Sequence, residues 1–224
     1  MLSGMALSQL LRLASPLLPV GAYAYSQGME WAVETGVVAD EASASHWIAD
    51  LLRFNVGTLE APVWTRLYKA WQQEDIQAAQ LWNDRFIAIR ETVEFRAETL
   101  QMGGALRAVL AATAEIDTAL LDQLQSPAFP AVFSFAAHGF GIPVREGLTG
   151  YLWAWAENQV SAALKLVPLG QSSGQRILVE LIGMLPAVAQ QALEMPDDEL
   201  SNFSPGLAIA SSRHETQYTR LFRS

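Results

Sequence analysis

The residue types that perform metal and nucleophilic chemistry are few and widely spaced in this chain. Its three histidines, His46, His138 and His214, form neither an HxxxH nor an HxH pair, the local spacing that transition-metal sites usually show. Ser26 stands in Tyr-Ser-Gln-Gly, which lacks the leading glycine of a nucleophile elbow, so we interpret it as a helix cap. The sequence therefore predicts no metal ligands and no catalytic nucleophile.

Phosphate-binding and thiol chemistry are equally unsupported. The Gly103-Gly104 pair and the Gly139-Phe-Gly141 motif match neither a P-loop nor a dinucleotide-binding fingerprint. The chain has no cysteine, which excludes disulfides, zinc–thiolate sites and cysteine-ligated clusters. We expect a protein that is not an enzyme and that carries no cofactor.

Charge and hydropathy limit the partners and the location. The formal net charge of −9 argues against nucleic acid, whose phosphates require a basic face. The longest run without charged residues, 123–144, is interrupted by prolines and glycines, so it predicts no membrane span. Residues 1–20 have no basic start followed by an apolar core. We therefore predict no secretory signal and a cytoplasmic location.

Helical periodicity dominates the elements that must position the remaining candidates. Leu7, Leu10, Leu11 and Ala14 follow the i, i+3, i+4, i+7 spacing of one helix face, and no useful stretch alternates as a strand does. The break points predict an all-α, single-domain bundle of about ten helices over residues 1–224. The expected helices cover approximately residues 7–14, 26–36, 40–52, 63–71, 75 past 90 toward 103, 106–114, 118–124, 130–139, 148–166, 177–185 and those after 205.

Charged residues are dense between Arg90 and Arg96. In a continuous helix, Arg90 and Glu94 would form an i, i+4 ion pair, worth a few tenths of a kcal/mol if exposed. The segment is then either a solvated helix face or a polar patch that faces a partner. Both interpretations remain open at this point.

A proline-containing bend precedes the second expected helix. Pro16, Pro19 and Gly21 form a rigid bend that presents Tyr23 and Tyr25. Tyrosine offers a large contact area with little rotamer entropy to lose, which favours a docking surface. Packing of both rings in the core is the alternative.

Lys165 lies near the end of another expected helix. The helix dipole favours a positive charge there, which is a purely structural explanation for the lysine. The apolar run Leu166–Leu169 follows it. That run fits either the core or a partner.

The end of the chain is basic and aromatic, although the chain as a whole is acidic. In Ile209–Ser224, three arginines and one glutamate give a charge of +2, which leaves −11 for the rest. The segment carries Tyr218, Leu221 and Phe222 and contains no glycine or proline. Aromatic residues and arginine carry most of the binding energy at protein interfaces, so residues 209–224 are predicted to be a partner-docking tail.

Three stretches together resemble the family of the urease accessory protein UreF. The first is Leu10–Gly36, with Leu-Ala-Ser-Pro-Leu-Leu-Pro-Val-Gly-Ala-Tyr-Ala-Tyr-Ser-Gln-Gly-Met-Glu-Trp, and the second is Lys165–Gln171. The third and most specific is the tail, Ala208–Ser224, with Arg-His-Glu-Thr-Gln-Tyr-Thr-Arg-Leu-Phe-Arg-Ser. Glu94–Arg96 resembles a weaker feature of the family. The chain length and the helical pattern agree with it along nearly the whole sequence.

The resemblance implies an all-α, homodimeric, cytoplasmic chaperone without enzymatic activity. Such proteins act in nickel insertion into apo-urease. They bridge the accessory protein UreD (UreH in some organisms) and the GTPase UreG, and the assembly docks on the urease apoprotein. A scaffold of this kind needs docking surfaces rather than a catalytic cleft, which agrees with the lack of catalytic motifs.

The resemblance also implies which residues contact partners. In the tail, the candidates for engaging UreD and for ordering the complex for UreG are His214, Tyr218, Arg220 and Phe222. Tyr23 and Lys165 match positions linked to the dimer surface at which UreG is recruited.

Two other functions compete with the scaffold. The first is direct regulation of GTP hydrolysis by UreG, with Arg213 or Arg220 supplied in trans. The second is a helical enzyme with a hidden site, or a direct role in binding nickel. The nearest acidic cluster, Pro196–Glu199, reads as a solvated turn before the last helix.

Overall fold

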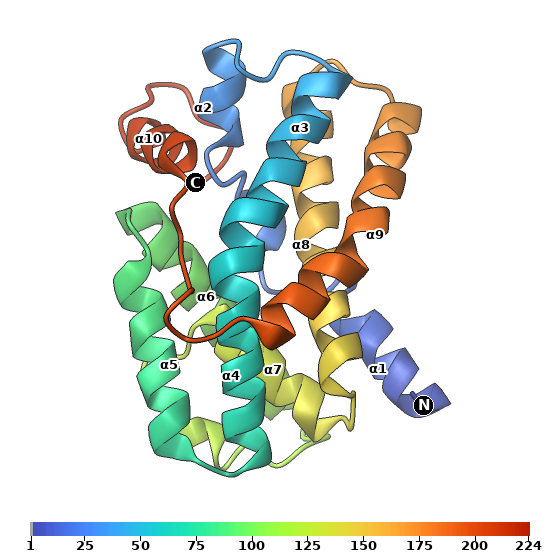
Figure 1. Cartoon of the computed structure of the whole chain (residues 1–224), viewed down its shortest axis with the longest axis vertical. Helices are drawn as coiled ribbons and strands as arrows, with labels where there is room; N and C mark the ends of the chain where they lie inside the picture. Colours follow the sequence, from blue (N-terminus) through green and yellow to red (C-terminus); the bar gives the residue numbers. More distant parts are fainter. Residues whose placement is uncertain (1) are drawn as a thin grey trace.

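Helices account for all regular secondary structure in residues 2–224, the residues that the computed structural model describes (Figure 1). The α-helices are α1 (Gly4–Leu13), α2 (Met29–Glu34), α3 (Glu41–Leu51), α4 (Ala61–Gln72), α5 (Ile76–Ile89), α6 (Val93–Thr113), α7 (Phe129–Gly139), α8 (Val144–Leu166), α9 (Gln171–Glu194) and α10 (Pro205–His214). Two short 3₁₀ turns, η1 (Ala22–Ala24) and η3 (Leu121–Gln123), and a π-helix, η2 (Leu52–Glu60), complete them. The prediction of an all-α domain of about ten helices is confirmed.

An aromatic core forms where α4, α7 and α8 meet. α4 packs against α7, and α8 packs against both of them and against α9. Trp64 stacks on Tyr68 with ring centroids 5.5 Å apart, and Phe133 meets Tyr151 edge to face at 5.1 Å. All four side chains are buried. Burial of a large apolar side chain contributes about 1.5–3 kcal/mol, so this core holds the helices that carry the rest of the molecule.

α3, the π-helix η2 and α4 follow one another without a break and form one continuous helical segment. η2 lies near the centre of Figure 1. Pro62 has no N–H to donate to the carbonyl four residues back, which belongs to Thr58. That carbonyl instead accepts from the backbone N–H of Ser201 at 3.0 Å. The N–H of Ala61 bonds to the carbonyl of Val56, five residues back, which is the wider turn of a π-helix.

The expected continuous helix from residue 75 past Arg90 is wrong. α5 ends at Ile89, and the backbone of Arg90 leaves the helical region at φ −64° and ψ 112°. Thr92 then caps a new helix, since its Oγ1 accepts from the backbone N–H of Phe95 at 3.2 Å. This break leaves Arg90 outside α6 and rules out the helical ion pair with Glu94.

Gly103 lies inside α6 and does not end it. A Cβ on Gly103 would stand 2.1 Å from the carbonyl oxygen of Pro127, so the glycine allows α6 to approach the chain before α7. The helix expected at 106–114 is therefore the second half of α6. The helix expected at 118–124 is reduced to the single turn η3.

α9 continues without interruption through Pro186 and ends at Glu194. It is the one helix in residues 2–224 that is long and apolar enough to cross a membrane, with a mean hydropathy of 1.3 over a window that is 39% buried. Length and composition alone are weak support for a membrane span, because a core helix passes the same test. Here α9 packs along α8 and contacts α3 and η2.

Candidate functional site

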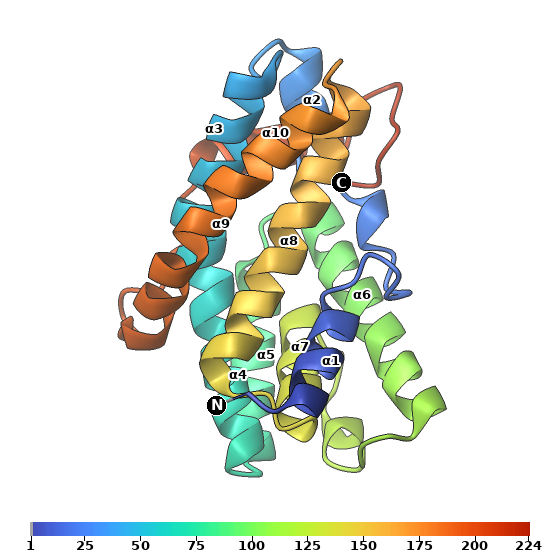
Figure 2. The same ribbon diagram turned by 90° about the vertical axis from the view of Figure 1, so that its right-hand side faces the viewer.

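The predicted tail folds back onto the body of the protein. Its first part, Ile209–His214, belongs to α10, which packs against α2. The chain after α10 loops outward and returns, so that the C-terminus lies beside the segment that enters α2 (Figures 1 and 2). The backbone N–H of Arg223 donates to the carbonyl of Ala24 at 2.8 Å. Two segments almost 200 residues apart in sequence are thereby joined.

Glu30, in the first turn of α2, binds the tail most extensively. Its Oε1 accepts from the backbone N–H of Leu221 at 2.6 Å, and its Oε2 accepts from that of Phe222 at 2.9 Å. The same Oε2 lies 3.1 Å from Nε2 of His214. The Glu30 side chain is 9% exposed, so these bonds replace most of the water that a carboxylate requires.

Glu94, in the first turn of α6, binds the tail from the other side. Its Oε2 lies 2.8 Å from Nδ1 of His214, and its Oε1 accepts from Nη1 of Arg220, also at 2.8 Å. The buried imidazole of His214 is therefore held between two carboxylates. We call Glu30, Glu94, His214 and Arg220 the tail clamp.

The last residue is bound separately, at Ser26 and Glu98. The backbone N–H and the hydroxyl of Ser26 donate to the backbone oxygen of Ser224 at 2.8 and 2.7 Å. The hydroxyl of Ser224 donates to Glu98 at 2.9 Å, and Nε2 of Gln27 donates to the same carboxylate at 2.7 Å. Burial raises the pKa of Glu98 to about 7.

Ser26 has a different main role from the predicted helix cap. α2 begins only at Met29, and its N-cap is Gly28, whose φ of 79° favours glycine. The Ser26 hydroxyl accepts from the backbone N–H of Glu30 at 3.3 Å, but it also donates to the end of the tail. It links the start of α2 to residue 224.

A second group of side chains gathers around Lys165. Its Nζ lies 5.9 Å from the ring centroid of Tyr23 and 5.5 Å from that of Phe222. These distances allow attraction between the cation and both ring faces. The Tyr23 ring is 69% exposed, whereas Phe222 is 6% exposed. We call these three residues the lysine–aromatic cluster.

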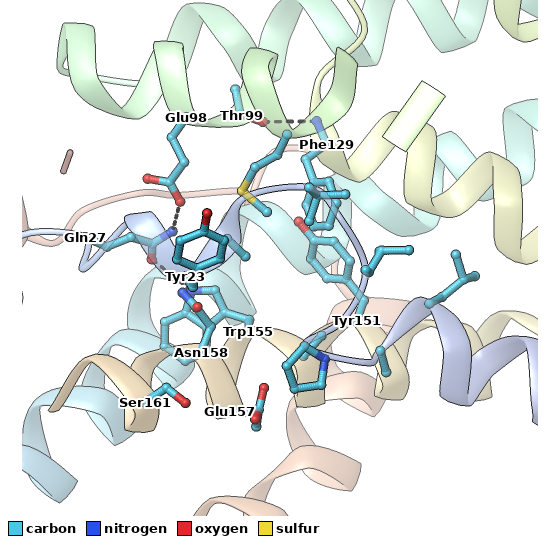
Figure 3. Close-up of a pocket in the computed structure, with 18 of the residues that line it drawn as sticks. Tyr23, Gln27, Glu98, Thr99, Phe129, Tyr151, Trp155, Glu157, Asn158 and Ser161 are labelled. Atoms are coloured by element: carbon cyan, nitrogen blue, oxygen red, sulfur yellow. Dashed lines mark hydrogen bonds between the residues drawn. The ribbon is translucent and has the colours of Figure 1, made fainter. Parts of the chain in front are cut away.

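A cavity of about 170 Å³ opens beside this cluster. Figure 3 shows Tyr23, Gln27, Glu98, Tyr151 and Trp155 around it. The Nε1 of Trp155 donates to Oε1 of Gln27 at 2.8 Å. The cavity thus joins the lysine–aromatic cluster to the carboxylate that binds the end of the tail.

Arg90 and Glu60 also line the cavity. Nη2 of Arg90 donates to Oε2 of Glu60, and the hydroxyl of Tyr151 donates to Oε1 of Glu60. All three are buried. Arg90 and Glu94 therefore belong to two different networks. Neither open interpretation of the 90–96 segment, a solvated face or a partner-facing patch, describes Arg90.

The structure places the predicted partner-binding residues in three settings. Tyr23, Lys165 and Phe222 meet in the lysine–aromatic cluster, and His214 and Arg220 meet at Glu94. Tyr218 is fully exposed, and Arg213 is exposed as well, so these two lie apart from both groups.

Sequence reasoning missed Glu30, Glu98 and the second role of Ser26. One signal was available for Glu30, because it stands between the apolar residues Met29 and Trp31 in a short helix. An acidic residue on a buried helix face needs a basic or N–H partner, and the basic tail is the obvious source.

No group of three or more histidine, aspartate or glutamate side chains in residues 2–224 has the geometry to hold a metal ion. His214 has both ring nitrogens engaged with carboxylates. Of the other two histidines, His138 lies edge-on to Tyr68 at 5.6 Å, and His46 is exposed on α3. The three histidines do not converge.

The fold and the site together define an all-α protein with a basic tail bound to an acidic body. A family model described as UreF matches residues 38–182. Three similar proteins are each named urease accessory protein UreF. The one from Azoarcus sp. is 54% identical over 97% of this chain and 95% of its own length. Those from Dechloromonas aromatica and Methylobacillus flagellatus are 51% and 47% identical, over 97% and 98% of both chains.

The chain therefore belongs to the UreF family of urease accessory proteins. The resemblance found in the sequence is confirmed, and with it a supporting role in urease maturation. The relatives are named as accessory proteins rather than as enzymes, which agrees with the expectation of a non-catalytic chain.

Proposed function

We propose that this protein is a non-catalytic scaffold that bridges UreD (or UreH) and the GTPase UreG during nickel insertion into apo-urease. One observation carries the proposal: Tyr23, Lys165 and Phe222, from three separate segments, lie together beside the tail. Together with the relatives' names, this supports a single docking region at this end of the molecule. The lysine–aromatic cluster would serve the homodimer surface and the recruitment of UreG.

The tail would serve as the docking element for UreD. Tyr218 and Leu221 point outward, being 103% and 66% exposed, and Arg213 and Arg223 are exposed as well. An exposed aromatic flanked by arginines is the composition that dominates protein interfaces. Because the inner side of the tail is bound to the body, less conformational entropy is lost when a partner binds.

The acidic body and the GTPase cycle complete the proposal. A net charge of −9 favours partners with basic surfaces and raises their association rate more than their affinity. If the scaffold binds UreG more tightly in its GTP-bound form, nucleotide state controls assembly and hydrolysis releases the complex. We place this cycle in the cytoplasm, with the assembly docked on the urease apoprotein.

The test is a pull-down of UreD and UreG with the Arg220→Ala variant, together with urease activation in cells. We expect loss of UreD and of activation, with an unchanged helical circular dichroism spectrum. Arg176→Ala is the matched control, because Arg176 is an exposed arginine in an ion pair with Glu41 on the body. Full activation by the Arg220 variant would refute the role of the tail.

Direct regulation of GTP hydrolysis by UreG is the second candidate. Arg213 favours it, because Arg213 is exposed and forms no salt bridge among residues 2–224, whereas Arg220 is committed to Glu94. An arginine supplied in trans accelerates GTP hydrolysis by stabilising the transition-state charge. Single-turnover hydrolysis by UreG, measured with wild type and with Arg213→Ala, decides the question. Equal rates with and without this protein would leave only the scaffold.

A further inference from the structure

The side chain of Glu30 binds the backbone of the tail as well as the tail's side chains. Its two oxygens accept from the consecutive backbone N–H groups of Leu221 and Phe222. Two successive N–H groups directed at one carboxylate fix the path of the chain, whatever the side chains are. Since the partner atoms are 191 and 192 residues away, this contact is a tertiary anchor and not a local turn.

The tail has little else to hold it in place. In residues 215–224, only Phe222 and Ser224 are buried, so the hydrophobic contribution comes from one aromatic ring. The other attachments are hydrogen bonds to Glu30, Glu94, Ser26, Glu98, Ala24, Val93 and Gln101. A segment with so few apolar contacts opens at a low free energy unless polar bonds retain it.

The anchor also determines which side chains of the tail face outward. Leu221 and Phe222 are adjacent, yet Leu221 is 66% exposed and Phe222 is 6% exposed. With its backbone fixed at Glu30, Phe222 points to Lys165 and Arg220 points to Glu94. Tyr218 is left at the outer side of the loop. A change in the backbone path at residues 221 and 222 would displace all of these groups together.

We propose that Glu30 is a positioning residue for partner docking, which holds residues 218–223 in the conformation that the partner recognises. Glu94 supports it by binding His214 and Arg220. This inference rests on the proposed function, in which the tail binds UreD. Glu30 itself is buried and acts through the tail, so it needs no contact with the partner.

The first test uses trypsin, because the tail contains its own cleavage sites. Glu30→Gln keeps the size of the side chain but removes its charge and one of the two acceptor oxygens. Loss of charge-assisted hydrogen bonds of this kind is expected to raise the rate of cleavage after Arg220 by about tenfold or more. Glu34→Gln is the matched control, since Glu34 lies on the same helix but is exposed. Cleavage after Lys69, in α4, would report unfolding of the body instead.

The second test is a double-mutant cycle for UreD binding in the full-length protein. Tyr218→Ala is expected to weaken binding without changing the trypsin rate. Glu30→Gln is expected to weaken binding by at least about tenfold, matching the opening of the tail. If Glu30 acts through the tail, the double variant binds about as weakly as the weaker single variant. A residue that supports the fold alone would give additive losses.

The outcomes separate this inference from the proposed function. Faster cleavage after Arg220 combined with non-additive binding losses supports the inference. An unchanged trypsin rate in Glu30→Gln, or additive losses, overturns it even if Tyr218→Ala binds poorly. If Tyr218→Ala and Glu30→Gln both bind UreD normally while the tail is opened, the docking role of the tail fails and the inference fails with it.

Discussion

Residues 2–224 contain two buried networks of charge that differ in what surrounds them. In the body, Arg90 binds Glu60, and its guanidinium also lies over the rings of Phe86 and Phe95, 4.5 and 5.6 Å from their centroids. In the tail clamp, His214 and Arg220 bind Glu30 and Glu94, and the Arg220 side chain is 41% exposed. The chemistry is the same, but only the first network is enclosed by aromatic side chains on helices of the core.

This difference teaches that the surroundings of a buried ion pair, and not the pair itself, decide what breaking it does. The body network cannot open unless η2, α6 and α8 separate, which means global unfolding. The tail clamp can open while every helix of the body stays in place, because the tail is held mostly by polar bonds. The first network is expected to control stability, and the second to control the conformation of a binding segment.

The largest expected effect comes from breaking the body network. Arg90→Ala leaves the buried carboxylate of Glu60 without its charge partner and removes packing on Phe86 and Phe95. Loss of one member of a buried pair costs about 3–5 kcal/mol. Urea unfolding followed by circular dichroism should show this loss in the free energy of unfolding. A change below about 1 kcal/mol, comparable to an exposed pair, would mean that the network is not enclosed as described.

Glu98 connects the body to the end of the tail, and its contribution to folding stability depends on pH. Its pKa is raised from 4.5 to about 7, first by burial. Between these two values the folded state binds a proton that the unfolded state has released. The contribution of Glu98 to stability is therefore complete below pH 4.5 and is lost as pH rises through 7. The shift corresponds to about 3 kcal/mol.

Glu98→Gln imitates the protonated form, since its amide can still accept from Gln27 and donate to Ser224. Relative to wild type, this variant should gain about 3 kcal/mol in the free energy of unfolding between pH 4.5 and pH 8. When the free energy of unfolding of wild type is subtracted from that of the variant, the titration of the groups that the two proteins share cancels. Parallel stability curves over this range would show that the burial of Glu98 does not shift its proton affinity.

Local periodicity and chain breaks predicted most of the fold but not the ion pairs. The 3.6-residue pattern located the helices, because each one buries an apolar face. The expected ion pair of Arg90 and Glu94 does not form, because α6 begins only after its N-cap, Thr92. Arg90 therefore lies outside the helix that contains Glu94. The i, i+4 rule applies only within one helix, so a cap between the two residues redirects both side chains.

The candidate site was predicted only in part, from the composition of the tail and from the family resemblance. Tyr23, Lys165 and Phe222 came from the resemblance, and the structure shows that they meet. Glu30 and Glu98 were missed because their partners in the tail lie 126 to 192 residues away. Composition gave the basic tail and the acidic body, but no spacing rule indicates which acidic residue receives which part of the tail.

The smallest expected effect is that of replacing Phe222, and it tests most sharply whether the tail differs from the core. Phe222 is as buried as many core residues, at 6% exposed, yet it belongs to the tail. Phe133→Ala, in the core, should cost about 3–5 kcal/mol in the free energy of unfolding. Phe222→Ala should cost only about 1 kcal/mol, because the loss cannot exceed the free energy with which the tail is bound to the body.

The same two variants should also differ in which sites trypsin cleaves. Phe222→Ala removes the one buried ring of the 215–224 segment, so cleavage after Arg220 should accelerate while fragments cut after Lys69 stay absent. Phe133→Ala should expose both sites together, because it lowers the stability of the body. If Phe222→Ala instead costs as much as Phe133→Ala in urea, the tail unfolds only with the core. The two charge networks would then belong to one cooperative unit.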